Sequence, residues 1–318
     1  MRKKAYFKSV TIFLSILLVF SQLQLFSLPA YGETVSDQPL LFRSVGVAQS
    51  GTTYYVDGEG GNNANDGQSP ASAWRDFEKV NQTEFQPGDH LLLNAQSTWN
   101  NQLLHPKGNG TAAQKIVIDF YDTNDKGETI FETTRRPIIN GGGTYSTGTF
   151  KRAISGAVQL VNQESWDISN LEVTNTPELD NLEGYKKPGD AQRAGILVLG
   201  YEQNRTFNSV TIRNNYVHDV QTEYYLNLSG NTATKRLKAV GGIIVLGSWF
   251  DENGNVVTAA NDHRTTTGFN DILIENNVIQ RVGLEGIRTK ADSDTSRGNT
   301  FYKTFSNITI RNNYLEDI

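Results

Sequence analysis

The sequence predicts an all-β fold, a right-handed parallel β-helix, which is a solenoid whose successive coils stack on one another. Three segments align without gaps, and each reads apolar, polar, apolar, then Asn-Asn, then apolar again; they are 208–220, 270–282 and 306–318, with a weaker copy at 166–176. One coil cannot bury its own apolar side chains, whereas stacked coils give each inward Ile or Val a neighbour above and below. The repeat therefore indicates a solenoid.

The Asn pairs are predicted to form the corners between strands. Asn tolerates the left-handed backbone of a sharp corner, and stacked Asn side chains can hydrogen-bond in a ladder. A second apolar element precedes each of the three stronger copies, at 195–200, 242–247 and 286–289. The spacers vary in length while the repeat does not, so the insertions should line up on one side of the stack.

Residues upstream of these repeats are predicted to form the first coils. Strands are expected over 53–57, 87–94 after a turn, 115–120 and 137–140. A short amphipathic helix is expected over 73–80. Lying across the first coil, this helix would be an N-terminal cap over an otherwise open core and sheet edge.

The N-terminal residues have the order of a secretory signal peptide. Four basic residues lie among the first eight, an apolar stretch follows over 10–28, and Ala30 and Gly32 are small. We expect cleavage after Gly32 and secretion to the extracellular space, with an uncleaved membrane anchor as the alternative. The predicted parts are a signal peptide over 1–32, a linker over 33–52 and a β-helix domain over 53–318.

The chain ends at Ile318, directly after the third strong Asn pair, with no polar cap, helix or closing strand in its sequence. Solenoids require caps at their ends. We therefore expect that C-terminal coils and a cap are missing from the chain. The alternative is that Ile318 abuts a partner or another copy of the chain, and the oligomeric state is open.

Charge and cysteine content argue against two classes of function. Loss of the signal peptide removes four positive charges and changes the formal net charge from −5 to −9, which argues against a general nucleic-acid binder. Acidic residues dominate the range 33–190, whereas 191–318 is balanced, so the second half would receive an anionic ligand better. The absence of cysteine excludes disulfides and thiol catalysis.

Several motifs can be compared with those of known families. They are Tyr54-Tyr-Val-Asp57, Asp66-Gly-Gln-Ser-Pro-Ala-Ser-Ala-Trp74, Phe85-Gln-Pro-Gly-Asp89, Pro137-Ile-Ile-Asn-Gly141 and the Ile-x-Ile-x-Asn-Asn coils. Together they resemble secreted bacterial right-handed β-helix proteins of the pectate-lyase-like superfamily. The resemblance covers about residues 53–318 and implies a groove for an extended sugar chain on the outer face of one sheet. It does not choose among polysaccharide lyases, glycoside hydrolases and binding proteins.

The strand that follows Glu285 carries the catalytic candidates. With a strand period of two, Arg288 and Lys290 lie on the same face. Two adjacent cations suit a uronate-containing polysaccharide, and a Lys with lowered pKa can remove the C5 proton in β-elimination. The segment resembles the catalytic strand of alginate-lyase and chondroitinase-B-like enzymes, which implies Lys290 as the base, with Arg288 and Glu285 beside it. The alternative is that both cations pair with neighbouring carboxylates on a solvated face.

The insertions supply candidate ligand-binding residues. Exposed aromatic side chains suit stacking on sugar rings, although they can equally pack the insertions onto the stack. The candidates for substrate binding are Trp249, Tyr224, Tyr225, His263 and Arg264. Asp292 and Asp294, with Asp262, are candidate ligands of Ca²⁺, which prefers several oxygen ligands and also binds uronates. No other cofactor is expected.

The leading hypothesis is a secreted polysaccharide lyase that cleaves uronate-containing glycans by β-elimination. The first alternative is a glycoside hydrolase, which needs two carboxyl groups about 5–9 Å apart. Its candidates near strand ends are Asp190, Asp219, Asp262 and Glu285. The second alternative is a non-catalytic carbohydrate-binding β-helix. His218 occupies the position of Gln280 and Glu316 in other coils, and we interpret it as an outward polar site.

Overall fold

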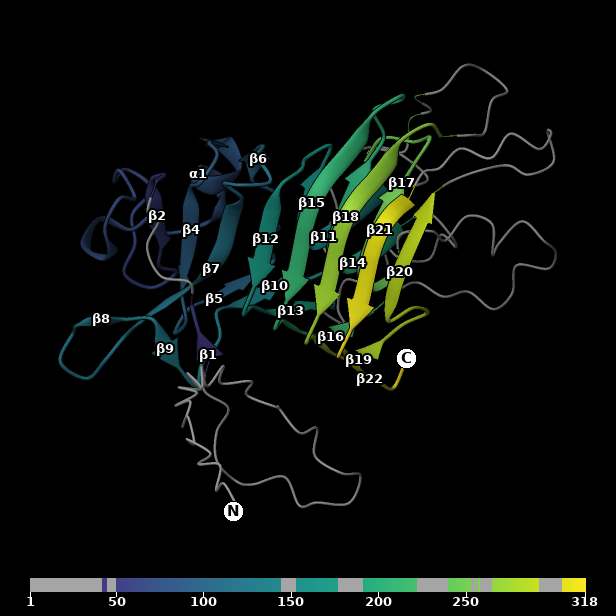
Figure 1. The fold of residues 1–318 in the computed structure, drawn as a ribbon. Coiled ribbons are helices and arrows are strands. Elements are labelled where there is room, and N and C mark those ends of the chain that lie inside the picture. The colour runs from purple at the N-terminus through teal and green to yellow at the C-terminus, as the bar shows by residue number, and fades with distance from the viewer. Residues whose placement is uncertain are drawn as a thin grey trace, which may run out of the picture. The chain divides into compact units, whose positions relative to one another are not determined.

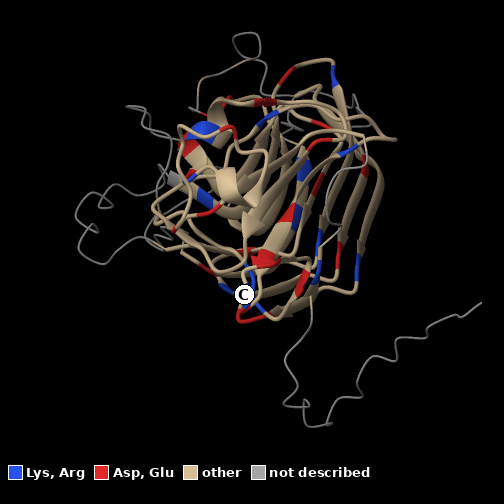
Figure 2. Ribbon diagram, turned by 90° about the vertical axis from the view of Figure 1, so that its left-hand side faces the viewer, with Lys and Arg blue, Asp and Glu red and all other residues tan. Residues whose placement is uncertain are grey.

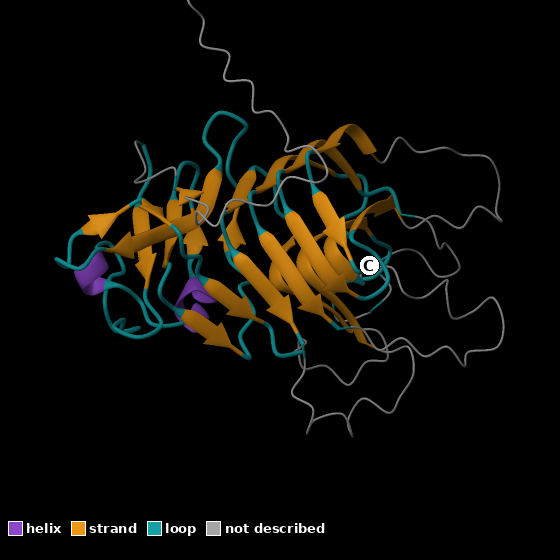
Figure 3. Cartoon of the chain, turned by 90° about the horizontal axis from the view of Figure 1, so that it is seen from below, coloured by secondary structure: helices purple, strands orange, loops and turns teal. Residues whose placement is uncertain are grey.

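The computed structural model describes residues 42–44, 50–143, 153–176, 191–221, 240–252, 255, 257, 265–291 and 305–318. Strands make up most of these residues, and the helical segments among them are short (Figure 3). No described helix has the length and apolar composition needed to cross a membrane. The chain divides into two units, Met1–Pro39 and Leu40–Ile318. The first unit contains the predicted signal peptide and lies outside the described residues.

Most described strands belong to three parallel sheets, in which strands from successive repeats pair in chain order. The first sheet contains β2 (Thr53–Val56), β4 (His90–Asn94), β7 (Ile116–Thr123), β12 (Trp166–Ser169), β15 (Thr206–Arg213), β18 (Gly268–Glu275) and β21 (Phe305–Arg311). The second contains β5 (Thr98–Asn100), β10 (Ile138–Asn140), β13 (Glu172–Asn175), β16 (Tyr216–Val220), β19 (Val278–Val282) and β22 (Tyr314–Glu316). The third contains β11 (Ala153–Val161), β14 (Ala191–Gly200), β17 (Gly241–Gly247) and β20 (Ile287–Ala291).

In Figure 1 the strands of the first sheet from β4 to β21 lie side by side, and the colour changes steadily from one strand to the next. This arrangement agrees with the predicted all-β chain of stacked parallel strands. The remaining elements are β1 (Phe42–Arg43), β3 (Glu84–Phe85), β6 (Lys107–Gly108), β8 (Thr129–Ile130), β9 (Glu132–Thr133), a 3₁₀ helix (Pro70–Ser72) and α1 (Phe77–Gln82). Strand β1 pairs antiparallel with β9, so part of the predicted linker forms a strand.

The pairing register confirms the alignment of the repeats. Val210 on β15 pairs with Ile272 on β18, which pairs with Ile308 on β21. The connection from β16 to β17 is much longer than the connection from β19 to β20, yet β17 and β20 pair in regular register. The register therefore does not depend on the length of the connection.

Inward side chains from successive coils form one continuous hydrophobic core. Ile118, Ile168, Ile212 and Ile274 pair in a column through the first sheet, and each is fully buried. Burial of one such side chain stabilises the folded state by about 1.5–3 kcal/mol. Several of the alternate positions carry charged residues, among them Asp167, Arg213 and Glu275, and Figure 2 shows Lys and Arg interspersed with Asp and Glu over the coils.

The corner between the first and second sheets is built from the Asn pairs, as predicted. The first Asn of each pair has a left-handed backbone, with φ of 57° at Asn214 and 55° at Asn276. The second Asn points inward. Asn277 Oδ1 accepts two hydrogen bonds from Asn215, one from the backbone N–H (3.0 Å) and one from the side-chain Nδ2 (3.1 Å). Asn277 Nδ2 donates to Asn313 Oδ1 (2.9 Å), which continues the ladder into the next coil.

The N-terminal helix begins later than the predicted range of 73–80. It spans Phe77–Gln82, because the Asp76 side chain caps its N-terminus by accepting a hydrogen bond from the backbone N–H of Glu78 (3.0 Å). Two of its side chains are buried in the core. Its role as a cap over the first coil stays a prediction, as does the right-handed sense of the coils.

Replacement of the ladder residue Asn277 by Ala should destabilise the protein by about 2 kcal/mol or more, because it leaves buried backbone and side-chain groups without partners. The free energy of unfolding is measured by urea denaturation. The matched control is Asn276→Gly. Asn276 is the exposed neighbour of Asn277, and Gly readily adopts its left-handed backbone conformation. Equal stabilities of the two variants would contradict the role given to the ladder.

Candidate functional site

The outer face of the third sheet carries the predicted catalytic candidates. Arg288 pairs with Ile244 on β17, and Lys290 pairs with Leu246. Ile244 and Leu246 belong to a small apolar cluster that is separate from the main core. The residues of β17 that belong to the main core are Ile243 and Val245. Arg288 and Lys290 therefore share the outer face, as the strand period predicted.

This face combines an ion pair with buried apolar side chains. Arg288 Nη1 lies 2.6 Å from Glu285 Oε1, so the chain itself supplies the negative charge beside that cation. Leu197 on β14 and Leu246 on β17 are buried on the same face. The Glu285 contact matches the ion-pair alternative for Arg288, and the role of Lys290 as a base stays a prediction.

The other predicted site residues are only partly described. Trp249 follows β17, is half-buried, and packs its ring on that of Phe250 with centroids 3.5 Å apart. Outside the described residues lie Tyr224, Tyr225, His263, Arg264, Asp292, Asp294, Asp190 and Asp262. Within the described ranges, no group of three or more His, Asp or Glu side chains is placed to hold a metal ion.

The outer face of the second sheet gathers a group that we call the His218 cluster: Glu172, Tyr216, His218, Asp219 and Arg281. His218 Nδ1 lies 2.5 Å from Asp219 Oδ2, and His218 Nε2 lies 3.1 Å from Glu172 Oε1. Arg281 binds both oxygens of Asp219 at 2.8 Å. The Tyr216 ring stacks on the imidazole with centroids 4.1 Å apart. One imidazole thus bridges two carboxylates contributed by different strands.

Three successive coils contribute to the His218 cluster. Glu172 lies on β13, His218 and Asp219 on β16, and Arg281 on β19. The outer column that contains His218 continues through Gln280 into β22, as predicted from the repeats. Asp219 and Arg281 also occupy equivalent repeat positions, both with left-handed backbone. Opposite charges at equivalent positions of adjacent coils were a sequence signal for this contact.

The electrostatics of the His218 cluster favour a charged imidazole beside an ionised carboxylate. Burial opposes the positive charge of His218, but its hydrogen bonds to Glu172 and Asp219 outweigh burial and raise its pKa. Hydrogen bonds from Arg281, aided by His218, lower the pKa of Asp219 to about 2. The cluster therefore holds an ionised carboxylate and a proton on neighbouring side chains, which is the pairing that acid–base chemistry uses.

A second charged group lies on the outer face of the first sheet and was not found from the sequence. Lys115 Nζ contacts Thr211 Oγ1 at 2.8 Å, and Arg213 Nη2 contacts Asp167 Oδ2 at 2.7 Å. Burial lowers the pKa of Lys115, although the charges of Asp167 and Asp271 oppose this. Burial also raises the pKa of Asp167. A lysine with a lowered pKa can act as a general base, and a neighbouring arginine can neutralise a carboxylate, as β-elimination of a uronate would use.

Comparisons with known proteins place the chain near one group of enzymes. No family model matches it. The chain is 29% identical over 268 residues to a lacto-N-biosidase of Bifidobacterium longum subsp. longum, a match that covers 76% of this chain and 16% of the relative. Two crystal structures of the GH136 lacto-N-biosidase from Eubacterium ramulus align with TM-scores of 0.59 and 0.61, at 24% and 23% identity. Each alignment covers 84% of this chain and 42% of the solved chain, so the likeness to these structures is one of fold.

The raised pKa of His218 predicts a specific dependence of stability on pH. Because the folded protein binds this proton more tightly than the unfolded chain, the contribution is complete below about pH 6.5 and is lost as pH rises through the raised pKa. In urea denaturation, His218→Gln should show a weaker loss of stability between about pH 6 and 8 than the original protein. Gln occupies the equivalent position in the next coil, so the substitution suits the strand. Identical pH dependences would rule out this role for His218.

Proposed function

We propose that this protein is a carbohydrate-active protein of the glycoside hydrolase type. The observation that carries the proposal is the sequence match to a curated lacto-N-biosidase over 76% of the chain. This match favours glycoside hydrolysis, the first alternative from the sequence, rather than β-elimination, the leading hypothesis from the sequence. The shared fold with the solved lacto-N-biosidase structures supports the same class. Secretion and a glycan substrate belong to this proposal.

The His218 cluster is the candidate site for hydrolysis among the described residues. In glycoside hydrolysis an acid gives a proton to the glycosidic oxygen, and water supplies a hydroxyl group to the sugar carbon. Asp219, with its lowered pKa, would be the ionised carboxylate. The imidazole of His218, whose pKa is raised and which lies between Asp219 and Glu172, would carry the proton. The two carboxyl groups lie on opposite nitrogens of one ring, which keeps them apart but within the same site.

Lys115 favours a second candidate function, β-elimination. Its pKa is lowered by burial, and Arg213 is close enough to contribute to this lowering. A lysine of this kind, in its neutral amine form, can take up the C5 proton of a uronate while a neighbouring cation neutralises the carboxylate. The sequence match is to a lacto-N-biosidase, which favours hydrolysis, so we rank this function second.

The two functions give different products from the same incubation. The purified protein is incubated with neutral oligosaccharides, including a lacto-N-bioside, and with uronate polysaccharides. We expect new reducing ends from a neutral substrate, without the ultraviolet absorbance of an unsaturated sugar. Unsaturated product from a uronate polymer would instead support elimination at Lys115. Retention on a glycan gel without any product would assign the chain to carbohydrate binding.

Substitutions in the His218 cluster test the site. Glu172→Gln and Asp219→Asn should each lower kcat by about 10²–10⁴-fold, the usual contribution of a positioned acid or base. Glu316→Gln is the matched control, because Glu316 lies on the outer face of β22 and contacts Gln280 but not the cluster. A rise in KM at constant kcat would limit the cluster to binding, and unchanged kinetics would remove it from the site.

A further inference from the structure

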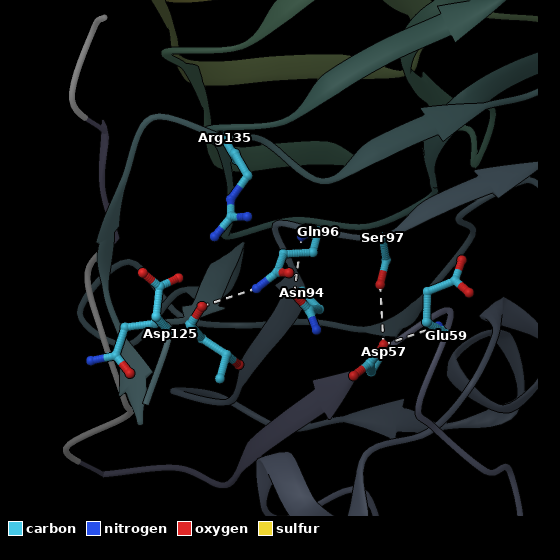
Figure 4. A pocket seen from close by; sticks show the side chains of 9 residues that line it. Asp57, Glu59, Asn94, Gln96, Ser97, Asp125 and Arg135 are labelled. Atoms are coloured by element: carbon cyan, nitrogen blue, oxygen red, sulfur yellow. Dashed lines mark hydrogen bonds between the residues drawn. The ribbon is translucent and has the colours of Figure 1, made fainter. Parts of the chain in front are cut away.

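A polar pocket lies where the first strands of the first sheet end (Figure 4). Its volume is about 520 Å³, which falls in the range typical of small-molecule sites. Its lining residues are Asp57, Glu59, Asn94, Gln96, Ser97, Thr123, Asn124, Asp125 and Arg135. Arg135 follows β9, the others follow or end the strands β2, β4 and β7, and none of the lining residues belongs to the His218 cluster. We call this the Asp57 pocket.

The carboxylate of Asp57 is fixed in the wall of this pocket. Its Oδ1 accepts hydrogen bonds from the backbone N–H groups of Glu59 and Gly60, both at 3.0 Å, and from Ser97 Oγ at 3.2 Å. Burial opposes the charge of Asp57, but these hydrogen bonds outweigh burial and lower its pKa. Asp57 is therefore an ionised acceptor held in one orientation.

A buried carboxylate behind the pocket fixes two more of its side chains. Asp122, whose side chain is fully buried, accepts hydrogen bonds from Gln96 Nε2 (2.8 Å) and from Arg135 Nε (3.0 Å) and Nη2 (3.1 Å). Gln96 Nε2 also donates to the Thr123 carbonyl at 3.0 Å. Both protons of this amide are thus engaged, and Oε1 is the acceptor that Gln96 offers to a ligand. The pocket is preorganised rather than assembled by its ligand.

An unsatisfied polar atom lies close to the same wall. The hydroxyl of Tyr121 is buried and has no hydrogen-bond partner within the described part of the chain. Burial, and next the nearby charge of Asp57, raise its pKa, so it remains a neutral donor. Buried hydroxyls are nearly always satisfied in folded proteins, and the side chain of Asn94, which lines the pocket, lies close enough to Tyr121 to influence its pKa.

The chemistry of the lining selects among ligands. Three carboxylates, from Asp57, Glu59 and Asp125, face a single cation, Arg135, which is already paired with Asp122. This excess of negative charge repels acidic sugars. The lining contains amides, carboxylates and hydroxyls but no aromatic ring, which suits hydrogen bonding to sugar hydroxyls rather than stacking.

We propose that the Asp57 pocket binds a neutral sugar unit, as a carbohydrate site distinct from the His218 cluster. The proposal extends the proposed function to a second site. It is tested by binding without turnover, so a protein that fails to hydrolyse any glycan can still bind sugar here, and the two proposals can fail separately. The preorganised acceptors give the site its selectivity, and its charge excludes uronates.

Sugar binding is measured by saturation-transfer NMR and calorimetric titration of the full chain with galactose, glucose, N-acetylglucosamine and galacturonate. At least one neutral sugar should bind, and galacturonate should bind at least about tenfold more weakly. Gln96→Ala and Asp125→Ala should each weaken the neutral sugar by about tenfold, equivalent to about 1.4 kcal/mol. Glu84→Gln is the control, because Glu84 is exposed on β3 and lies outside the pocket lining.

Thermal unfolding of each variant confirms that it folds before binding is compared. Failure of every neutral sugar to bind the original protein overturns the proposal. So does binding that survives both pocket substitutions at full strength, because the sugar then sits elsewhere. Tighter binding of galacturonate than of the neutral sugars overturns the charge argument and with it the assignment of ligand class.

Discussion

The hydrogen bonds of the inward Asn side chains are the interaction on which the described fold depends. Each corner must turn the chain sharply, and the turn leaves backbone groups that a buried strand end cannot expose to water. The side chains of Asn215 and Asn277 satisfy such groups in the preceding coil. At each corner the first Asn of the pair turns the chain and the second ties its coil to the preceding one, which favours the register of the apolar columns.

Both polar sites arise from this register. Residues that are distant in sequence become neighbours because each coil advances the chain by one strand spacing. The His218 cluster combines Glu172 with Arg281 through one imidazole, and the Asp57 pocket collects the ends of β2, β4 and β7. In each case a carboxylate is held by several donors, so its charge is stabilised before any ligand arrives. The stacked strands fix the positions of these side chains, and the outward-facing residues provide the charged and polar groups.

The repeats made the fold predictable from the sequence. The sites could not be predicted in the same way, because their residues come from different coils and are brought together only in the folded stack. Period-two alternation and the Asn corners predicted the strands of the later coils and the outward position of His218, because both patterns are local. The pairing of Arg288 with Glu285, only three residues away, was also within reach of the sequence. Glu172 and Lys115 were missed because their partners lie in other coils, 46 residues away for His218 and 96 for Thr211. The helix boundary was missed because the capping side chain of Asp76 outweighed the apolar pattern.

Strands β17 and β20 pair in register although the connections that lead to them differ greatly in length. The cost of closing a loop grows only slowly with its length, so an insertion at this edge costs the core little. These connections can therefore be lengthened or replaced during evolution without a change in the packing of the coils. Protein engineers can use the same tolerance. A peptide grafted between β16 and β17 would be displayed by a scaffold whose fold depends on the Asn corners between the first and second sheets.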